Sequence, residues 1–313
     1  MKVTVSAPGK VNLMGEHAIV YGRPSVLTAV DLRLTATVSD APSGLHVDAP
    51  EDTEYVASIV RSTALYVKIK KLPGMHISIT SQIPVGYHLG SSAAVAVAVS
   101  GAVSYFLKRV FNPEHINRIA YEAEKIKHGN PSGGDNTAVC FGGFIWYRKE
   151  LEFLRTLWQV PITISPGLSH FCLLDTGRPE ESTGEMVGFV AERMRASPET
   201  YERIFTENER QVKRVVMAFK TSDGGMLKDA IQKGSRTLAE MDVVSGHAQK
   251  IIDRVEASGG AAKILGGGGR KHAVGYLLAY HDDKKTLTEA VGNTIPVRDV
   301  VLGCGGVRLE GHD

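Results

Sequence analysis

The segment at residues 90–110 constrains the fold most, because it joins a tight turn to a long run of small side chains. Gly90 is followed by Ser91 and Ser92, which supply the N-cap chemistry of a helix. Small and apolar residues then continue to about residue 110. The longest apolar stretch, residues 93–99, is too short and too rich in alanine to span a bilayer. The segment therefore predicts a long helix that begins at a glycine–serine turn.

Strand and helix signals alternate on both sides of this segment. Apolar residues with period two predict strands, and apolar residues at helical spacing predict helices. Glu124 lies at the edge of the apolar stripe of one such helix, which Gly129 ends. Strands with helices gathered between them predict an α+β fold. The expected strands are residues 3–6, 32–38, 76–80, 142–147, 170–175, 273–280 and 300–302, and the expected helices are residues 55–69, 91–110, 114–127, 181–247 with two breaks, and 248–257.

The chain has 313 residues, which exceeds the size at which one core usually stops growing, so we expect two lobes. Two prolines in the segment 149–167 mark the boundary and divide the chain into residues 1–160 and 161–313. Hydrophobic residues make up 43% and charged residues 22%, and the formal net charge is +2. These values are typical of a soluble globular protein. Because basic residues are spread along the chain without a block, nothing indicates a nucleic-acid or membrane partner.

The cysteines and the first residues indicate the compartment. Cys140, Cys172 and Cys304 are odd in number, far apart and not in CxxC spacing. They are therefore interpreted as free thiols in a reducing environment. The first nine residues resemble a strand and contain no apolar core of a secretory signal. We expect a cytoplasmic protein.

Three features of the sequence point to the same chemistry. The turn at residues 84–92 opens a helix, whose N-terminal N–H groups and partial positive charge attract anions. A serine hydroxyl at that turn can reach a Mg²⁺ ion bound to a phosphate. Lys10 follows a strand and a Pro-Gly turn, and Asp135 lies in a glycine-rich loop. An ammonium, a carboxylate and a phosphate-binding turn are the parts needed to move a phosphoryl group onto an alcohol.

Each of these features also has an ordinary structural explanation. A lysine at a turn is most often solvated, and Asp135 could be a loop residue or a helix cap. Glu124 could be a surface residue of its helix. The glycine run at residues 266–269 could be a tight turn or a linker, although it lies between an apolar segment and a strand. The order of the features along the chain, more than any one of them, favours a small-molecule kinase.

In this order the motifs resemble the GHMP kinase superfamily, which is named after galactokinase, homoserine kinase, mevalonate kinase and phosphomevalonate kinase. The resemblance spans nearly the whole chain, and within the superfamily the chain is most similar to the mevalonate kinase family. The three superfamily signatures match residues 7–11, 84–94 and 262–269, and the motifs of the mevalonate kinase family match GEH at 15–17, VYG at 20–22 and NPSGGDN at 130–136.

The resemblance implies a two-lobed fold with the active site in the cleft between the lobes. The N-terminal lobe would be a ribosomal-protein-S5-like β/α unit that binds ATP, and the C-terminal lobe would be ferredoxin-like. The implied reaction is Mg²⁺-dependent transfer of a phosphoryl group from ATP to (R)-mevalonate. Its product, 5-phosphomevalonate, belongs to isoprenoid biosynthesis. The resemblance also implies a homodimer.

The resemblance further implies a role for each matched residue. Asp135 would take or position the proton of the substrate hydroxyl, and Lys10 would hold that carboxylate ionised and stabilise phosphoryl charge. Ser92 and Glu124 would ligate Mg²⁺ between the ATP phosphates. The residues implied to bind substrate are Glu16, His17 and Thr183, those implied to bind ATP are Gly86, His88, Leu89, Gly90, Ser91, Ser92 and Ala93, and the glycines at 266–269 would shape the far wall of the site.

The chain departs from the family pattern at three places. Tyr87 and His88 stand where the family has a small residue and a glycine before Leu-Gly-Ser-Ser. Glu181 replaces an arginine, although Arg178 is close in sequence, and residues 270–272 are basic where the family has glycines and a small residue. These departures leave open a superfamily kinase for another hydroxy acid or sugar, or a ligand sensor without activity. The retained lysine and aspartate favour the enzyme.

Overall fold

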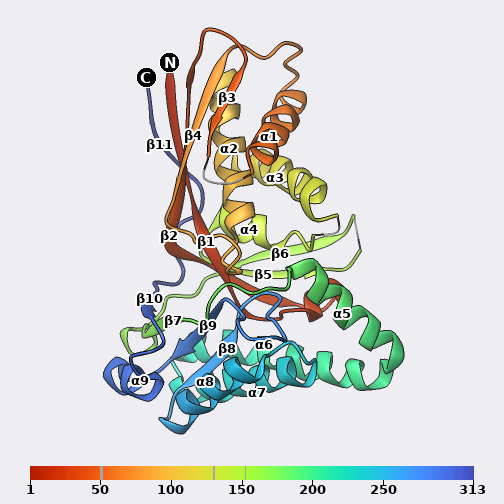
Figure 1. Ribbon diagram of the computed structural model, residues 1–313, viewed down its shortest axis with the longest axis vertical. Coiled ribbons are helices and arrows are strands. Elements are labelled where there is room, and N and C mark those ends of the chain that lie inside the picture. The colour runs from red at the N-terminus through yellow and green to blue at the C-terminus, as the bar shows by residue number, and fades with distance from the viewer. Residues whose placement is uncertain (50–51, 130, 152) are drawn as a thin grey trace.

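The computed structural model describes residues 1–49, 52–129, 131–151 and 153–313, and it shows two β-sheets with helices packed against them (Figure 1). Its elements in chain order are β1 (Lys2–Met14), η1 (Ala18–Tyr21), β2 (Ser25–Asp40), β3 (Leu45–Asp48), α1 (Thr53–Tyr66), β4 (Met75–Ser81), α2 (Ser91–Lys108), α3 (Pro113–His128), α4 (Gly134–Phe141), β5 (Phe144–Lys149), β6 (Arg155–Val160), η2 (Pro166–Leu168), β7 (Phe171–Asp175), α5 (Thr183–Ala196), α6 (Pro198–Thr221), α7 (Gly224–Glu240), α8 (Gly246–Ala257), β8 (Ala261–Ile264), β9 (Tyr276–Tyr280), α9 (Lys284–Val291), β10 (Val297–Asp299) and β11 (Arg308–His312).

The larger sheet has the strand order β11-β1-β2-β4-β3, and β5 and β6 continue from β2. Its longest pairing is the antiparallel pair of β1 and β2, which runs from Lys2 opposite Ser39 to Met14 opposite Val26 and shifts its register at two places, between Pro8 and Gly9 and between Asn12 and Met14. The smaller sheet has the order β10-β7-β9-β8. Helices α1 to α4 lie beside the larger sheet and α5 to α8 beside the smaller one (Figure 1). The predicted α+β class is confirmed.

Helix α2 is the helix expected from the glycine–serine turn, and it ends at Lys108, two residues before the predicted end. By length and composition alone it is the one helix of the described residues that could cross a membrane. Its alanines and valines are buried, however, and the helix packs against β1, β2, α1 and α3. Small side chains allow this close approach to the sheet. The core of the fold therefore accounts for its apolar character.

One apolar cluster runs from the larger sheet into the smaller one, so the two sheets share a core. Phe219 of α6 stands between them: its ring centroid lies 5.6 Å from that of Phe144 on β5 and 6.1 Å from that of Phe171 on β7. A second cluster fills the space between the smaller sheet and helices α5 to α8. Aromatic pairs at these separations add to the stabilisation from apolar burial.

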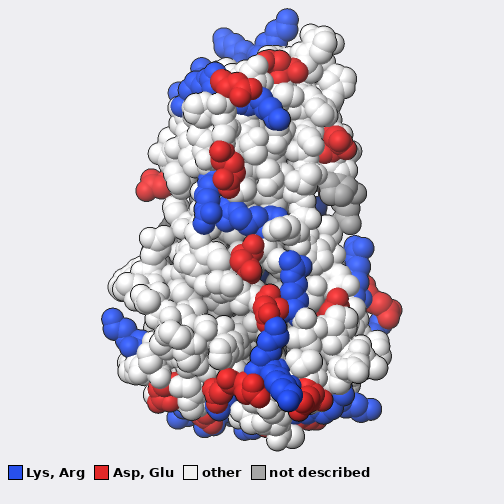
Figure 2. Space-filling view, turned by 90° about the vertical axis from the view of Figure 1, so that its left-hand side faces the viewer, with Lys and Arg blue, Asp and Glu red and all other residues white. Residues whose placement is uncertain are grey.

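The outer face of the larger sheet is polar but carries no extended patch of one charge. Along β2 buried and part-exposed residues alternate, as expected for a strand with one face in the core. The outward positions on neighbouring strands are rich in threonine, and Thr4 and Thr37 pair through their hydroxyls at 3.2 Å. Figure 2 shows acidic and basic groups interspersed over the face turned to the viewer.

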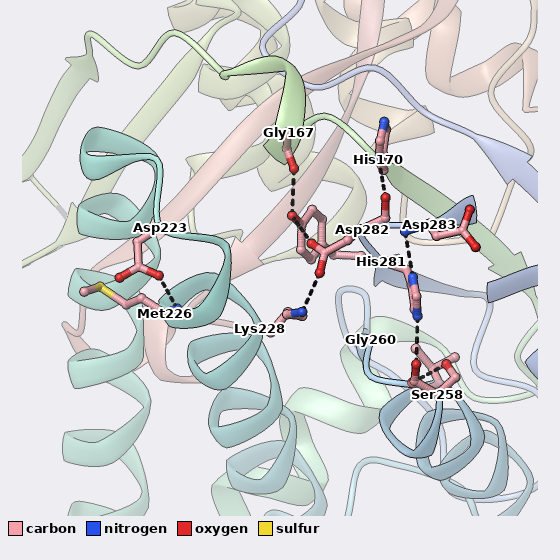
Figure 3. Close-up of polar contacts among 12 residues, drawn as sticks. Gly167, His170, Asp223, Met226, Lys228, Ser258, Gly260, His281, Asp282 and Asp283 are labelled. Carbon is pink, nitrogen blue, oxygen red and sulfur yellow. Dashed lines mark hydrogen bonds and ion pairs between the residues drawn. The ribbon is translucent and has the colours of Figure 1, made fainter. Parts of the chain in front are cut away.

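A polar network holds η2, the short helix between the two halves of the chain, onto the smaller sheet (Figure 3). Tyr280 Oη lies 2.9 Å from the carbonyl oxygen of Gly167 and 2.9 Å from Asp282 Oδ1. Lys228 of α7 donates to the same carboxylate at 2.6 Å. Beside it, His281 Nε2 lies 3.0 Å from the carbonyl oxygen of Ser258. The network connects η2, α7, α8 and the end of β9.

Several sequence expectations need correction. The expected strand at 300–302 is wrong: Leu302 makes only an isolated bridge, while the last strands are β10 and β11. Strands β3, β6, β8, β10 and β11 were not predicted. The β11 strand pairs antiparallel with β1, so the end of the chain lies in the first sheet and crosses the expected division at residue 160. The two breaks expected in the long helical region are confirmed at Ser197 and Ser222.

Candidate active site

The centre of the site is an ion pair between Lys10 and Asp135. Lys10 lies in the middle of β1, where its backbone N–H donates to the carbonyl oxygen of Leu89 at 2.9 Å. Its Nζ lies 3.0 Å from Asp135 Oδ1; the lysine side chain is 3% exposed and the aspartate side chain 43%. Asp135 sits in the first turn of α4, where a carboxylate is favoured by the helix dipole. The lysine of the pair is therefore buried, whereas the carboxylate is open to solvent.

Gly90 allows Lys10 to reach this position. The residue has a φ of +75°, and a Cβ placed on it would stand 2.8 Å from Lys10 Cγ. Any other residue type would be strained by the backbone and would also collide with the lysine stem. Gly90 is at the same time the N-cap of α2, so the N–H groups of Ser91 and Ser92 begin the helix directly beside the ammonium. A helix N-terminus next to a buried lysine is a suitable place for an anion.

Ser92 and Glu124 lie together, as expected for two oxygen ligands of one ion. Ser92 Oγ donates to Glu124 Oε2 at 3.2 Å, and Tyr55 Oη of α1 donates to the other carboxylate oxygen at 2.5 Å. The Glu124 side chain is 4% exposed, so the alternative that it is a surface residue does not hold. A hydroxyl and a carboxylate oxygen suit Mg²⁺, which keeps several waters and phosphate oxygens as its remaining ligands. The described residues contain no cluster of three or more His, Cys, Asp or Glu side chains.

Glu16 and His17 lie at the end of β1 and are buried, with 1% and 5% exposure. His17 Nε2 lies 3.2 Å from the carbonyl oxygen of Gly267 in the glycine run, and burial lowers the pKa of His17 to about 4. The imidazole is therefore neutral at neutral pH. Glu16 pairs with Lys263 of β8, a fully buried lysine with 0% exposure. The sequence interpretation assigned no role to Lys263, although this residue lies within the third signature.

Thr183 brings the second half of the chain to the same site. It is the first residue of α5, fixed by a capping box in which Ser182 and Glu185 satisfy each other's backbone N–H groups. Thr183 Oγ1 lies 3.3 Å from Nδ1 of His88, and a Cβ on Gly267 would stand 3.2 Å from Thr183 Cα. The start of α5, the glycine run and the turn before α2 are therefore in direct contact.

His88 adopts the left-handed conformation expected for its position, with a φ of 62°. Its ring packs so closely on Gly266 that a Cβ there would stand 2.7 Å from His88 Cβ. The neighbouring Tyr87 ring lies 5.0 Å from the ring of Tyr276 on β9. Burial, and to a lesser extent the positive charge of Lys10, lower the pKa of His88 to about 4. Tyr87 and His88 therefore pack the turn before α2 against the smaller sheet and the glycine run.

The other departures from the family pattern lie around the start of α5. Arg178 packs its Nε 2.9 Å from where a Gly86 Cβ would stand, so it covers the turn before α2. Glu181 accepts a hydrogen bond from the backbone N–H of Arg270 at 3.3 Å. The basic side chains after the glycine run are paired, Arg270 with Asp242 at 3.1 Å and Lys271 with Glu180 at 2.9 Å. They are therefore engaged with acidic residues of the protein itself.

Several buried polar atoms of this region have no hydrogen-bond partner within the described parts of the chain. They are Asn12 Oδ1, Glu16 Oε2, His17 Nδ1, His88 Nε2 and Glu181 Oε2. Buried polar atoms are normally satisfied, and an unsatisfied one carries a substantial free-energy cost. Their concentration between the end of β1, the turn before α2 and the start of α5 fits a site for a polar ligand.

The structure therefore brings together the residues that the sequence singled out. Lys10, Asp135, Ser92 and Glu124 come from the larger sheet and its helices, and Thr183 and residues 266–269 come from the second half of the chain. Asn130, part of the glycine-rich motif, lies outside the described residues. What the sequence did not reveal is Lys263, together with the contacts of Tyr87 and Arg178. Only the position of Lys263 inside a signature could have indicated it.

The fold and the site together define a GHMP kinase, and the model of the GHMP kinases N terminal domain matches residues 54–143. The chain is 31% identical over 290 residues to the mevalonate kinase of Thermococcus sibiricus, covering 83% of this chain and 87% of that one. It is 33% identical to the mevalonate kinase of Pyrococcus abyssi, covering 85% and 86%. The chain belongs to the mevalonate kinase family. Its fold matches L. major mevalonate kinase in complex with R-mevalonate, with a TM-score of 0.80 and 22% identity over 96% of both chains.

Proposed function

We propose that this protein transfers the γ-phosphoryl group of ATP to the primary hydroxyl of (R)-mevalonate, which gives 5-phosphomevalonate and ADP. The observation that carries the proposal is the Lys10–Asp135 pair, at 3.0 Å, beside the N-terminus of α2. It supplies a carboxylate for the alcohol and an ammonium for the phosphoryl charge. Membership of the mevalonate kinase family supports the choice of alcohol.

Asp135 accepts the hydroxyl proton as the substrate oxygen forms its bond to the γ-phosphorus and the bond to the bridging oxygen of ADP breaks. Its exposed carboxylate can meet the substrate, while the ammonium of Lys10, 3.0 Å away, holds the carboxylate in place. Lys10 and the N–H groups at the start of α2 stabilise the charge that spreads over the phosphoryl oxygens. Lys10 thus acts both on the carboxylate that accepts the proton and on the phosphoryl group that is transferred.

Ser92 and Glu124 are the residues that would hold Mg²⁺, and the fit of one hydroxyl with one carboxylate supports this. When bound, the ion neutralises charge on the ATP phosphates. Tyr55 orients the Glu124 carboxylate through its phenol hydrogen bond. Burial and the negative charge of Glu124 raise the pKa of Tyr55, so the phenol keeps its proton and continues to donate.

The test is ADP release with Mg·ATP on a panel of mevalonate, phosphomevalonate, homoserine and galactose. We expect turnover on mevalonate and its loss in Lys10→Met, whereas Lys271→Met, which removes an exposed lysine paired at the surface, keeps wild-type rates. Turnover on another panel member would identify that alcohol as the substrate, and the proposed phosphoryl transfer would still hold. Binding of ATP without turnover on any alcohol would overturn the proposal in favour of a sensor.

A further inference from the structure

Lys263 is buried at the centre of the molecule and has no access to solvent or ligand. Its ammonium bonds the Glu16 carboxylate, and it also donates to the carbonyl oxygens of Asn12 at 3.1 Å and of Ile264 at 2.7 Å. A lysine ammonium has three hydrogens, and these three acceptors use all of them. Any effect of Lys263 on a substrate must therefore pass through a residue that it holds.

The residue it holds has one carboxylate oxygen left over. Glu16 Oε1 meets the ammonium, while Oε2 is buried without a hydrogen-bond partner among residues 1–49, 52–129, 131–151 and 153–313. The same is true of Asn12 Oδ1. Asn12 follows Lys10 by two positions on β1, so their side chains leave the same face of the strand. Two vacant acceptors, one on the strand that carries Lys10 and one just after its end, fit the hydroxyl groups of an alcohol substrate.

We propose that Lys263 is a positioning residue, which holds one oxygen of the Glu16 carboxylate and leaves its second oxygen to accept a hydrogen bond from a hydroxyl of the bound alcohol. The inference rests on the proposed kinase function, which it deepens by naming an acceptor for the substrate and the cation that maintains it. Lys263 acts through Glu16 and touches neither the alcohol nor ATP.

Electrostatics explains why the acceptor needs a cation of its own. Burial raises the pKa of Glu16 above its usual value, and the charge and hydrogen bond of Lys263 are the main influences that oppose this rise; Lys10 opposes it less. The other titratable neighbour, His17, is neutral because burial lowers its pKa to about 4. A buried carboxylate without Lys263 would take up a proton, since an unpaired buried charge is far more costly than a neutral acid.

The pair also connects two parts of the chain that are remote in sequence. Lys263 is on β8 of the smaller sheet, whereas Asn12 and Glu16 bracket the end of β1 in the larger sheet. One ammonium thereby fixes the segment between Asn12 and Glu16 at both ends. This geometry sets the distance between Glu16 and the reacting pair around Lys10, which explains why a residue without substrate contact would affect substrate affinity.

The experiment compares Lys263→Met with the neutral double variant Glu16→Gln/Lys263→Met, and Lys271→Met is the surface control. Kinetic constants for mevalonate and ATP, calorimetric binding of mevalonate and ADP, and thermal unfolding are measured from pH 5.5 to 9. We expect Lys263→Met to raise the KM for mevalonate about ten- to a hundredfold, because a hydrogen bond to a charged acceptor is lost. ADP affinity should change less than about threefold, because Lys263 donates to no residue of the helix N-terminus that binds the phosphates.

The pH dependence separates positioning from a merely structural role. In Lys263→Met a raised Glu16 pKa means that the folded state holds a proton which the unfolded state releases, so stability falls as pH rises. Over the same range kcat/KM for mevalonate should rise with pH in this variant, because only ionised Glu16 is an acceptor for the hydroxyl. The double variant should lose both pH trends and regain stability, yet keep the high KM.

The proposal is overturned if Lys263→Met is less stable but has the wild-type KM for mevalonate and the wild-type pH profile. If Lys263→Met does not fold, the double variant decides: because the amide oxygen introduced by Glu16→Gln can still accept, a wild-type KM there shows that substrate binding needs neither an ionised Glu16 nor Lys263. Failure of the proposed function looks different, because the wild-type protein itself would not turn over mevalonate. The panel alcohol that is turned over would then take the place of mevalonate in the same KM comparison.

Discussion

Two lysine–carboxylate pairs lie close to β1, one at Lys10 within the strand and one at Glu16 just after its end, and they differ in access to solvent. In the pair of Lys10 and Asp135 the carboxylate is 43% exposed, whereas in the pair of Lys263 and Glu16 both partners are sealed, at 0% and 1%. An exposed carboxylate can exchange a proton with a substrate. A buried pair has a fixed geometry, and it contributes by holding the residues that it joins in place. The same two functional groups thus serve proton transfer in one place and, in our proposal, the positioning of a substrate acceptor in the other.

The largest expected effect comes from breaking the open pair. Asp135→Asn should lower kcat by about a hundredfold or more, because the proton acceptor is lost. The unfolding free energy should fall by about 1 kcal/mol or less, since the amide oxygen still accepts from Lys10 and the site is open to water. Steady-state kinetics and urea denaturation measure the two quantities. A loss of stability as large as that of Lys263→Met would contradict the distinction between the two pairs.

Gly90→Ala tests whether the open pair depends on the backbone beside it. The added Cβ would meet Lys10 Cγ at 2.8 Å in a residue with a φ of +75°, so the lysine must move. We expect kcat/KM to fall about tenfold or more and stability by about 1–2 kcal/mol. Gly188→Ala in α5 is the control, because its Cβ meets nothing within 4 Å. A Gly90→Ala enzyme with wild-type kcat/KM would show that Lys10 can accommodate the added Cβ.

Acid titration tests the buried region just after β1, where His17 lies. Folded His17 has a pKa of about 4, whereas an unfolded histidine titrates near 6.5. Between these values the unfolded state binds the proton, so stability falls as pH drops from about 6.5 towards 4. His17→Gln should remove about 1–3 kcal/mol of that pH dependence. Urea unfolding midpoints at pH 7 and pH 5 measure this dependence, and exposed His46→Gln is the control. An equal change of stability between the two pH values in His17→Gln and in wild type would contradict the prediction.

The smallest effect is expected at the turn before α2. His88→Gly removes a left-handed histidine and the ring that fills the space next to Gly266. Relief of about 1 kcal/mol of strain should offset the packing that is lost, so stability changes little. We expect the KM for ATP to fall a few-fold because the ring no longer occupies space beside the phosphates. A higher KM would mean that the ring itself binds the nucleotide.

The chemical half of the site was predictable because each residue stands in a local pattern. Gly90-Ser91-Ser92 is recognisable as a helix start, and Lys10 and Asp135 stand beside glycines whose conformations the structure confirms. Lys263 was not predictable in the same way, because its partners are 247 and 251 positions away. A lysine in an apolar segment indicates an exceptional environment, but the sequence alone does not say which acid it meets.

The fold shows the same division between local and distant information. Long elements such as α2 and the second half of β2 have clear periodicity, and their prediction is confirmed. The short strands β3, β8 and β10, of three or four residues, are too short for a pattern. The β11 strand has five residues, mostly polar and exposed, and only its pairing with β1 defines it as a strand. Pairing partners, not propensity, decide such segments.

That last pairing determines when the protein can finish folding during synthesis. The β1 strand is made long before β11, yet β11 (residues 308–312) is one of its two neighbours, and the two ends of the chain lie side by side (Figure 1). Until residues 308–312 have left the ribosome, the edge of β1 that pairs with them stays open. Unpaired strand edges are the places where nascent chains aggregate or meet chaperones. Residues 308–312 therefore close a strand made much earlier, and a chain truncated before residue 308 would leave that edge bare.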